Sequence, residues 1–342
     1  MPTKHFHMKN LHPTGLKSTI AAFVGNFIIT IFKFVGFFVS GSGAMFSEAI
    51  HSLADSSNQA LLIVGIKRSL KIADEEHSYG YGQERFFWAL ISACGIFFIG
   101  AGVTVYHGIV ALVGNVSIEI SSVVYWILGV SLLVEGTTLL FALKELRSAN
   151  TSLSLSEALV DGDPSTLAVI YEDSVAVLGV IVALISTLLT SLTNNHNYDS
   201  IGSIIIGVLL GIIAIVLIVK NRSYLIQKSM PEEMKERAIE IIEANPAIEK
   251  VIDFKSSVLD VGVYRIKCEV EFNGSALIKK MFGAGDFKEQ YEEIKDDYEE
   301  FLYFCVDYAD RVPRVIGEQI NEIEKKIKEE VPGIKHIDIE IN

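Results

Sequence analysis

Three side chains that can bind a metal ion follow one another at helical spacing within one apolar stretch of the chain. His51 and Asp55 are four residues apart, so they share one face of a helix, and Glu48 lies three residues before His51 on the same face. An imidazole nitrogen beside carboxylate oxygens in a dry cavity suits Zn²⁺ or a similar divalent ion. The pattern predicts a metal site, and the alternative is an internal polar patch or ion pair that only packs helices.

A second acidic group lies in a later apolar stretch, where Glu172 and Asp173 are adjacent. Neighbouring residues on a helix point about 100° apart, so one acid can face the pair of His51 and Asp55 while the other faces another helix or a water path. Ionisable side chains within a membrane are costly, and they mark functional sites. We expect Asp173 to be a ligand and keep Glu172 as a further candidate.

These groups must be positioned by six apolar stretches of about the length that crosses a bilayer, roughly 20 residues of helix. The stretches are approximately residues 17–39, 44–66, 86–113, 121–144, 164–190 and 200–220. A polar lead and the length of the first stretch argue against a cleavable signal peptide. Two more charges, Lys33 and Glu135, lie in the first and fourth stretches and are either parts of structural pairs or of a proton path.

The loops between the stretches separate by charge. Lys and Arg gather in the N-terminal lead and in the segments after the second, fourth and sixth stretches, whereas loops 40–43, 114–121 and 194–198 contain neither. Because positively charged loops stay in the cytoplasm, we expect both termini to be cytoplasmic. We expect a multi-pass membrane protein in contact with lipid, in the inner membrane of a prokaryotic cell.

The composition agrees with an apolar membrane domain followed by an acidic soluble one. Half of the 342 residues are apolar, 21% are charged, and the mean hydropathy is +0.39, which is unlike an ordinary soluble domain. The net charge of −13 argues against a partner that is a nucleic acid, because phosphates are bound by clustered Lys and Arg. Three widely spaced cysteines predict neither a disulfide framework nor a thiolate metal site.

The pattern changes to that of a cytoplasmic α+β domain at about residue 229, which predicts domains 1–228 and 229–342. The expected elements follow the ferredoxin-like order α-β-β-α-β, at residues 232–244, 251–256, 263–272, 314–330 and 334–341. An acidic insert rich in aromatic residues lies at about 284–310. The insert is either a further helix packed on something or a solvated charged arm.

Three features together resemble the cation diffusion facilitator family. They are the His-x-x-x-Asp pattern at 51–55, the segment Asp-Glu-Glu-His-Ser-Tyr-Gly-Tyr-Gly at 74–82, and six spans before a small α+β domain. The resemblance covers nearly the whole chain. Within the family, the adjacent acids at 172–173 and the long insert are similar to the branch that includes zinc transporter nine.

The resemblance implies a four-ligand transport site built from one His/Asp-x-x-x-Asp pair in each of the second and fifth spans. His51 and Asp55 match the first pair, and Asp173 matches the last acid of the second pair. Val169 departs from the family pattern at the remaining position. Glu48, Glu172 or a water must then complete the coordination.

Two other metal sites of the family are matched only in part. Asp74 and His77 match two ligands of a site in the loop after the second span, but Tyr81 replaces the third. The loop is therefore either a weak metal site or a solvated turn before a helix. The family's His-rich site in the cytoplasmic domain is expected to be absent, because His336 is the one histidine beyond residue 196.

The expected function is a secondary transporter that exports a divalent cation from the cytosol in exchange for protons and works as a homodimer. Zn²⁺ is expected as the transported substrate, and no organic cofactor and no enzymatic activity are expected. The alternatives are an exporter of Mn²⁺, Fe²⁺, Co²⁺ or Ni²⁺ and a transport-inactive regulatory or scaffold protein of the same fold. A membrane metalloprotease is disfavoured because the sequence has no HExxH motif.

Overall fold

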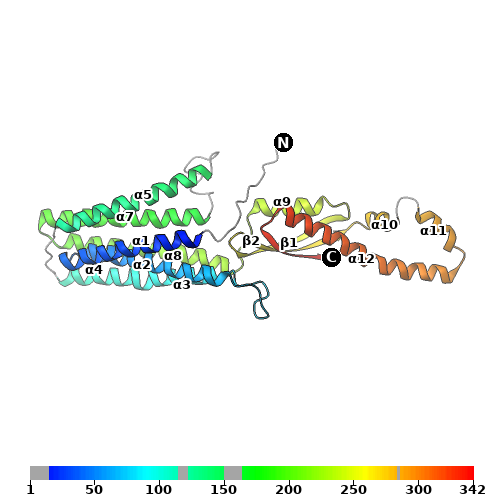
Figure 1. Cartoon of the computed structure of the whole chain (residues 1–342), viewed down its shortest axis with the longest axis horizontal. Helices are drawn as coiled ribbons and strands as arrows, with labels where there is room; N and C mark the ends of the chain where they lie inside the picture. Colours follow the sequence, from blue (N-terminus) through cyan, green and yellow to red (C-terminus); the bar gives the residue numbers. More distant parts are fainter. Residues whose placement is uncertain (1–14, 115–121, 150–163, 283–285) are drawn as a thin grey trace. The chain divides into compact units, whose positions relative to one another are not determined.

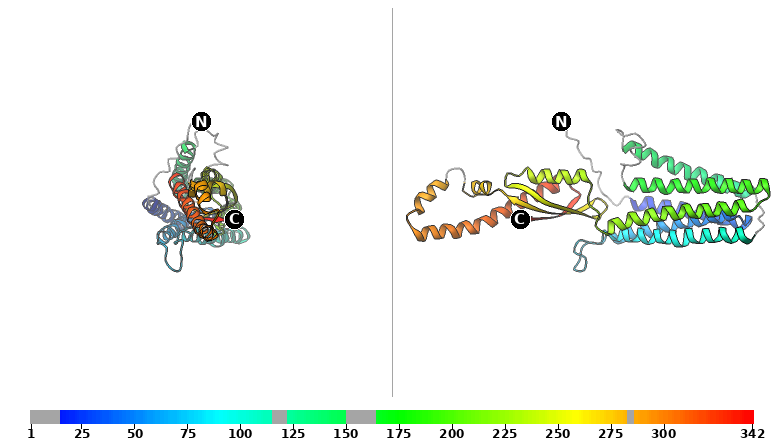
Figure 2. Two further views of the ribbon diagram at one scale, coloured as in Figure 1. Left: turned by 90° about the vertical axis from the view of Figure 1, so that its right-hand side faces the viewer. Right: turned by 180° about the vertical axis from the view of Figure 1, so that it is seen from behind.

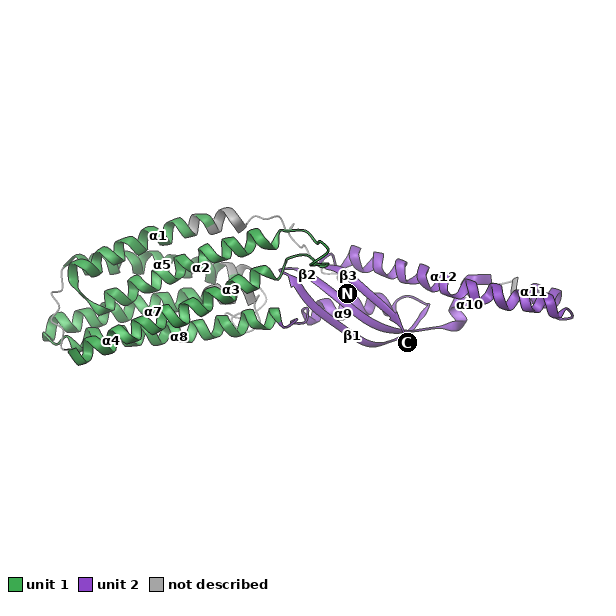
Figure 3. Cartoon of the chain, turned by 90° about the horizontal axis from the view of Figure 1, so that it is seen from below, with its two compact units in different colours: residues 1–225 green, residues 226–342 purple. Residues whose placement is uncertain are grey.

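The structure is a computed structural model that describes residues 15–114, 122–149, 164–282 and 286–342. Expectations about the N-terminal lead, residues 115–121 of one loop and the first residues of the insert lie outside this range. The chain divides into two compact units, Met1–Leu225 and Ile226–Asn342, coloured separately in Figure 3.

The first unit consists of long helices that run side by side (Figures 1 and 2). Their bounds are α1 Gly15–Ser40, α2 Gly43–Ser69, α3 Glu84–Gly95, η1 Ile96–Ala101, α4 Gly102–Gly114, α5 Ser122–Ala149, α7 Pro164–Thr193 and α8 Asn197–Leu225. The π-helix η1 continues α3 into α4 without a break, so residues 84–114 form one helical rod.

Five of the helical segments in the described part of the chain are long and apolar enough to cross a membrane. They are Phe23–Ser40, Glu84–Gly114, Ser122–Lys144, Ile170–Thr193 and Asn197–Leu225. The stretch expected at 44–66 does form a helix, α2, but it is not one of the five. Its polar side chains lower the hydropathy of the segment, because charged residues weigh heavily against membrane insertion. The expectation of six apolar spans is therefore met by five.

Helix α2 lies within the bundle, where α1, α3, α7 and α8 pack against it. Its residues Ala44, Met45 and Ala49 are fully buried, and Ala44 and Met45 join a core with residues of η1, α5, α7 and α8. Helices α4 and α8 approach closely at Gly108, where an added Cβ would lie 3.0 Å from the Ser200 carbonyl oxygen. Small residues allow such close backbone contact between membrane helices.

The second unit is a three-stranded mixed sheet with helices packed on it. Its elements are α9 Glu232–Glu243, β1 Ile248–Asp260, β2 Val263–Phe272, α10 Gly274–Phe282, α11 Asp286–Ile294, α12 Tyr298–Glu330 and β3 Ile334–Ile341. The strand order is β1-β2-β3, with β1 antiparallel and β3 parallel to β2. Buried isoleucines of α9, α12, β2 and β3 form the core, including Ile242, Ile266, Ile323, Ile327 and Ile334.

The order of elements in this unit agrees with α-β-β-α-β, with extra helices before the last strand. The acidic insert forms α11 and the first half of α12. The helix expected at 314–330 instead begins at Tyr298 and continues through Pro313. Asp297 caps this longer helix by accepting hydrogen bonds from the backbone N–H groups of Glu299 and Glu300. Helix α10 was not expected from the sequence.

Candidate functional site

His51 and Asp55 form a close pair on α2. His51 Nε2 lies 3.4 Å from Asp55 Oδ2. The His51 side chain is almost fully buried, and Nε2 has no hydrogen-bond partner among the described residues. A buried polar atom without a partner is rare and calls for an explanation. The nitrogen and the carboxylate oxygen are close enough to bind one ion together.

Helix α7 places its two acids near this pair but not in contact with it. Glu172 Oε1 accepts a hydrogen bond of 3.1 Å from Asn58 Nδ2 of α2. Asp173 and Glu172 both lie within electrostatic range of Asp55. In the described ranges, no three His, Cys, Asp or Glu side chains lie close enough together to hold a metal ion. The structure therefore joins two of the expected ligands and leaves the acids of α7 further away.

The carboxylate of Glu48 forms an ion pair with a lysine of α1. Lys33 Nζ of α1 donates to Glu48 Oε2 at 2.8 Å and to Glu135 Oε1 of α5, also at 2.8 Å. The side chains of Lys33 and Glu48 are completely buried. The sequence left open whether Lys33 and Glu135 belong to structural pairs or to a proton path, and in the structure they form an ion pair with each other. The pairing of Lys33 with Glu135 could not be predicted from local spacing, because the two residues are 102 positions apart.

Sequence reasoning missed Asp199, a fully buried acid at the start of α8. Its carboxylate accepts hydrogen bonds from the backbone N–H groups of Gly43 and Ala44 and from the Ser42 hydroxyl, the last at 2.6 Å. A carboxylate at a helix N-terminus satisfies free N–H groups and complements the helix dipole. Asp199 thus ties α8 to the first turn of α2. Its position at the start of an apolar helix was the available signal.

The loop after α2 is held by hydrogen bonds between its own side chains. Asp74 Oδ2 accepts from Lys71 Nζ at 2.7 Å and from the Tyr81 hydroxyl at 2.9 Å, while Oδ1 accepts from the His77 backbone N–H. The bond from Lys71 is the main cause that holds the pKa of Asp74 well below its usual range. The His77 ring lies against Tyr81, with centroids 4.3 Å apart. Both carboxylate oxygens of Asp74 are therefore already bonded.

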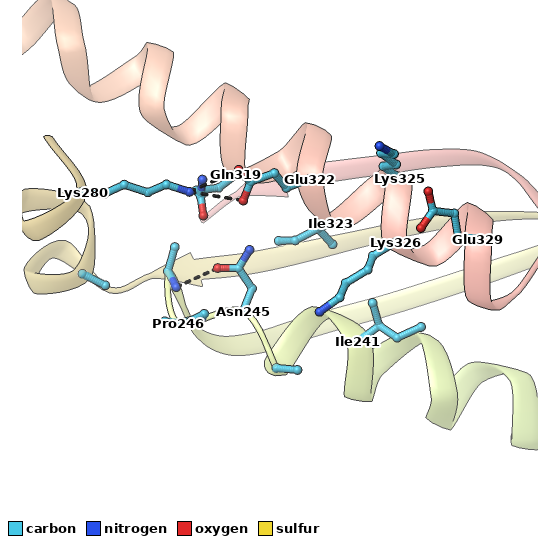
Figure 4. A pocket seen from close by; sticks show the side chains of 13 residues that line it. Ile241, Asn245, Pro246, Lys280, Gln319, Glu322, Ile323, Lys325, Lys326 and Glu329 are labelled. Atoms are coloured by element: carbon cyan, nitrogen blue, oxygen red, sulfur yellow. Dashed lines mark hydrogen bonds and ion pairs between the residues drawn. The ribbon is translucent and has the colours of Figure 1, made fainter. Parts of the chain in front are cut away.

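The second unit contains a pocket of about 490 Å³ between α9, α10 and α12 (Figure 4). Its ionisable lining residues are lysines and glutamates, among them Lys280, whose Nζ bonds to Glu322 at 3.2 Å. The described lining includes no histidine or cysteine.

Cys268 of β2 lies in the core, where burial raises the pKa of its thiol to about 12. A protonated thiol is a poor metal ligand.

Comparison with known proteins identifies similarity along almost the whole chain. Residues 19–226 match the family model of the cation efflux transmembrane domain. The mouse and human proteins named proton-coupled zinc antiporter SLC30A9, mitochondrial, are each 37% identical over 330 residues, covering 95% of this chain and 58% of their own length. Metal tolerance protein C4 of Arabidopsis thaliana is 35% identical over 326 residues, covering 92% of this chain and 71% of that protein. The chain thus spans less than two thirds of the animal relatives.

These relatives overturn the expected location in a prokaryotic inner membrane. The animal proteins carry the word mitochondrial in their names, and the third relative is from a plant. The expectation was wrong because loop charges distinguish the two sides of a membrane. They contain no information on which membrane holds the protein.

Proposed function

Because the chain belongs to the cation diffusion facilitator family of cation efflux proteins, we propose that it exports Zn²⁺ across a membrane in exchange for protons. The names of the animal relatives, which join zinc to proton coupling, support this substrate and this coupling. Their names also support an organellar membrane of a eukaryotic cell.

The spacing of His51 and Asp55 is the observation that carries this proposal. A tetrahedral zinc ion binds nitrogen and oxygen ligands at about 2.0–2.2 Å, so two of its ligand atoms lie about 3.4 Å apart. His51 Nε2 and Asp55 Oδ2 are separated by 3.4 Å, and the nitrogen has no hydrogen-bond partner among the described residues. One ion can bind both atoms without moving either.

Helix α7 supplies the remaining ligands in this proposal. Asp173 is the third ligand, and Glu172 is the candidate for the position that Val169 leaves open. Both acids lie within electrostatic range of Asp55, and α7 already packs against α2. A bound cation would attract the acids that repel one another in its absence. Metal binding would therefore draw α7 toward α2.

Proton coupling follows from the chemistry of these side chains. An imidazole and carboxylates in a site of low dielectric bind either a divalent cation or protons. Loading of Zn²⁺ from one side releases protons, and protonation on the other side releases Zn²⁺. The same residues thus couple the two gradients.

We also propose that α2 is the sixth span. Its 27 residues are long enough to cross the hydrocarbon layer, and four helices of the bundle pack on it. Charged residues in membrane helices face the bundle interior, and Glu48 and His51 are buried here. Two protomers form the transporter in this proposal.

The described residues contain no cluster of three His, Cys, Asp or Glu side chains, which supports a second candidate, a regulatory protein that has the fold but does not transport. Reconstitution separates the two functions. The purified protein is placed in liposomes with a pH gradient, and uptake of Zn²⁺, Mn²⁺, Fe²⁺ and Co²⁺ is compared side by side. If the protein is a transporter, liposomes that contain it should take up much more Zn²⁺ than empty liposomes do. If, for each of the four ions, uptake is the same with and without the protein, the regulatory protein is favoured.

A further inference from the structure

Lys33 places a permanent positive charge beside the candidate metal site. Its ammonium group is completely buried and bonds at 2.8 Å to carboxylates from two other helices, Glu48 of α2 and Glu135 of α5. Charge-assisted hydrogen bonds of this kind are strong and directional. Because each acid uses only one oxygen, Glu48 Oε1 and Glu135 Oε2 have no hydrogen-bond partner within the described ranges.

Glu48 is placed where it could reach a metal ion if it were free. It precedes His51 by one helical turn, on the same face of α2. Its unbonded oxygen points toward α7, where a Cβ added to Gly179 would lie 2.7 Å from Glu48 Oε1. The absence of a side chain at Gly179 leaves room for this oxygen. A free Glu48 would thus have both space and proximity to act as a ligand.

We propose that Lys33 determines metal specificity by holding Glu48 as its own counter-ion, out of the metal's ligand set. This inference rests on the proposed function. Removing one partner of a buried ion pair leaves an uncompensated charge and is strongly unfavourable. A metal ion therefore competes with Lys33 for the charge of Glu48, and recruiting both oxygens of Glu48 would leave Lys33 to Glu135 alone.

Exclusion of Glu48 keeps the ligand set small and retains the imidazole as a major part of it. Zn²⁺ accepts nitrogen and oxygen ligands in four-coordinate sites. Mn²⁺ favours carboxylate, carbonyl and water ligands in larger shells. An additional carboxylate from Glu48 would therefore favour Mn²⁺ relative to Zn²⁺. Lys33 acts as a positioning residue, since it reaches the metal only through Glu48.

Equilibrium binding of Zn²⁺ and of Mn²⁺ to the purified full-length protein in detergent tests this role. Lys33→Gln retains a hydrogen-bond donor and removes the charge, and we expect it to raise the affinity for Mn²⁺ relative to Zn²⁺ by roughly tenfold, as an added oxygen ligand would. Lys33→Gln combined with Glu48→Gln should return this ratio to that of the wild type. Lys33→Arg, which keeps the charge, and Glu135→Gln, which leaves the bond between Lys33 and Glu48, are the matched controls and should keep the wild-type ratio.

A purely structural ion pair gives a different result. In that case Lys33→Gln weakens the binding of Zn²⁺ and of Mn²⁺ equally, so the ratio of the two affinities stays that of the wild type, which overturns the proposal. If Lys33→Gln fails to fold, the single variant Glu48→Gln tests the proposal. If Glu48→Gln still binds Zn²⁺ in preference to Mn²⁺, the proposal is supported. If Glu48→Gln no longer binds Zn²⁺, Glu48 is a ligand and the proposal is refuted.

The failure of the inference can be told from that of the proposed function. Wild-type protein that binds Zn²⁺ but does not move it into liposomes refutes transport, while the binding ratios still report on Lys33. Wild-type protein that binds neither metal refutes both.

Discussion

His51 Nε2 lies 3.4 Å from Asp55 Oδ2 across one turn of α2, and no described group donates to or accepts from that nitrogen. At this distance the two groups form no hydrogen bond with each other. The distance matches the separation of two ligand atoms on one tetrahedral zinc ion, about 3.4 Å. In the proposed function, α2 alone would contribute two of the four ligands.

Alanine at Asp55 or at Asp173 should reduce the initial rate of Zn²⁺ uptake into liposomes by more than about tenfold, because each change removes an oxygen ligand from the site. Folding and dimer formation should be nearly unchanged. Asp310→Ala, at an exposed acid of α12, is the control and should transport as the wild type does. Full activity in either Asp55→Ala or Asp173→Ala would refute the assignment of that residue.

His51→Asp should retain transport but shift the preference toward Mn²⁺, because it exchanges a nitrogen ligand for a carboxylate oxygen. Competition between Zn²⁺ and Mn²⁺ during uptake measures the change. His196→Asp, at a histidine between α7 and α8, serves as the comparison. An unchanged order of metals in His51→Asp would mean that the imidazole does not touch the ion.

Alanine at both Asp74 and His77 should change Zn²⁺ uptake by no more than about threefold, since exposed ion pairs contribute little. The bond from Lys71 lowers the pKa of Asp74, so the loop contact is present above the ordinary pKa of an aspartate and is lost only at more acidic pH. The contact between Lys71 and Asp74 should therefore persist between about pH 5 and pH 8. Uptake that vanishes in the double variant would instead make the loop an entry site for the metal.

We predict that an exposed apolar face of α12, within the acidic insert, forms a contact between the two protomers of a dimer. Tyr298, Phe301 and Leu302 are all at least half exposed, whereas Phe304 stacks on Phe282 of its own unit at 6.0 Å between ring centroids. Leu302→Ser should therefore weaken the dimer measured by analytical ultracentrifugation. Phe304→Ser should mainly lower the melting temperature.

Deletion of residues 286–305 extends this test. It should weaken the dimer, while EDTA should leave the dimer of the intact protein unchanged. A dimer that survives both the deletion and Leu302→Ser would remove the insert from assembly. Dissociation by EDTA would point to a metal in the second unit.

Local spacing accounts for what could be predicted from the sequence. His51 and Asp55 are four positions apart, which places them on one face of a helix. The strands of the second unit follow from alternating apolar residues. The contacts of Lys33 could not be predicted, because its partners lie 15 and 102 residues away and depend on how three helices pack. The long α12 was missed because Pro313 and the surrounding charges resemble a helix boundary.

The central claim is that one site exchanges Zn²⁺ for protons, and the pH inside liposomes tests it most directly. Vesicles that contain the protein and a pH-sensitive dye, with no initial pH difference, receive Zn²⁺ outside. We predict that zinc entry drives protons outward, so that the interior becomes alkaline, and that Asp55→Ala abolishes this change. Zinc entry without any change of internal pH, or an equal change in Asp55→Ala, would contradict the account.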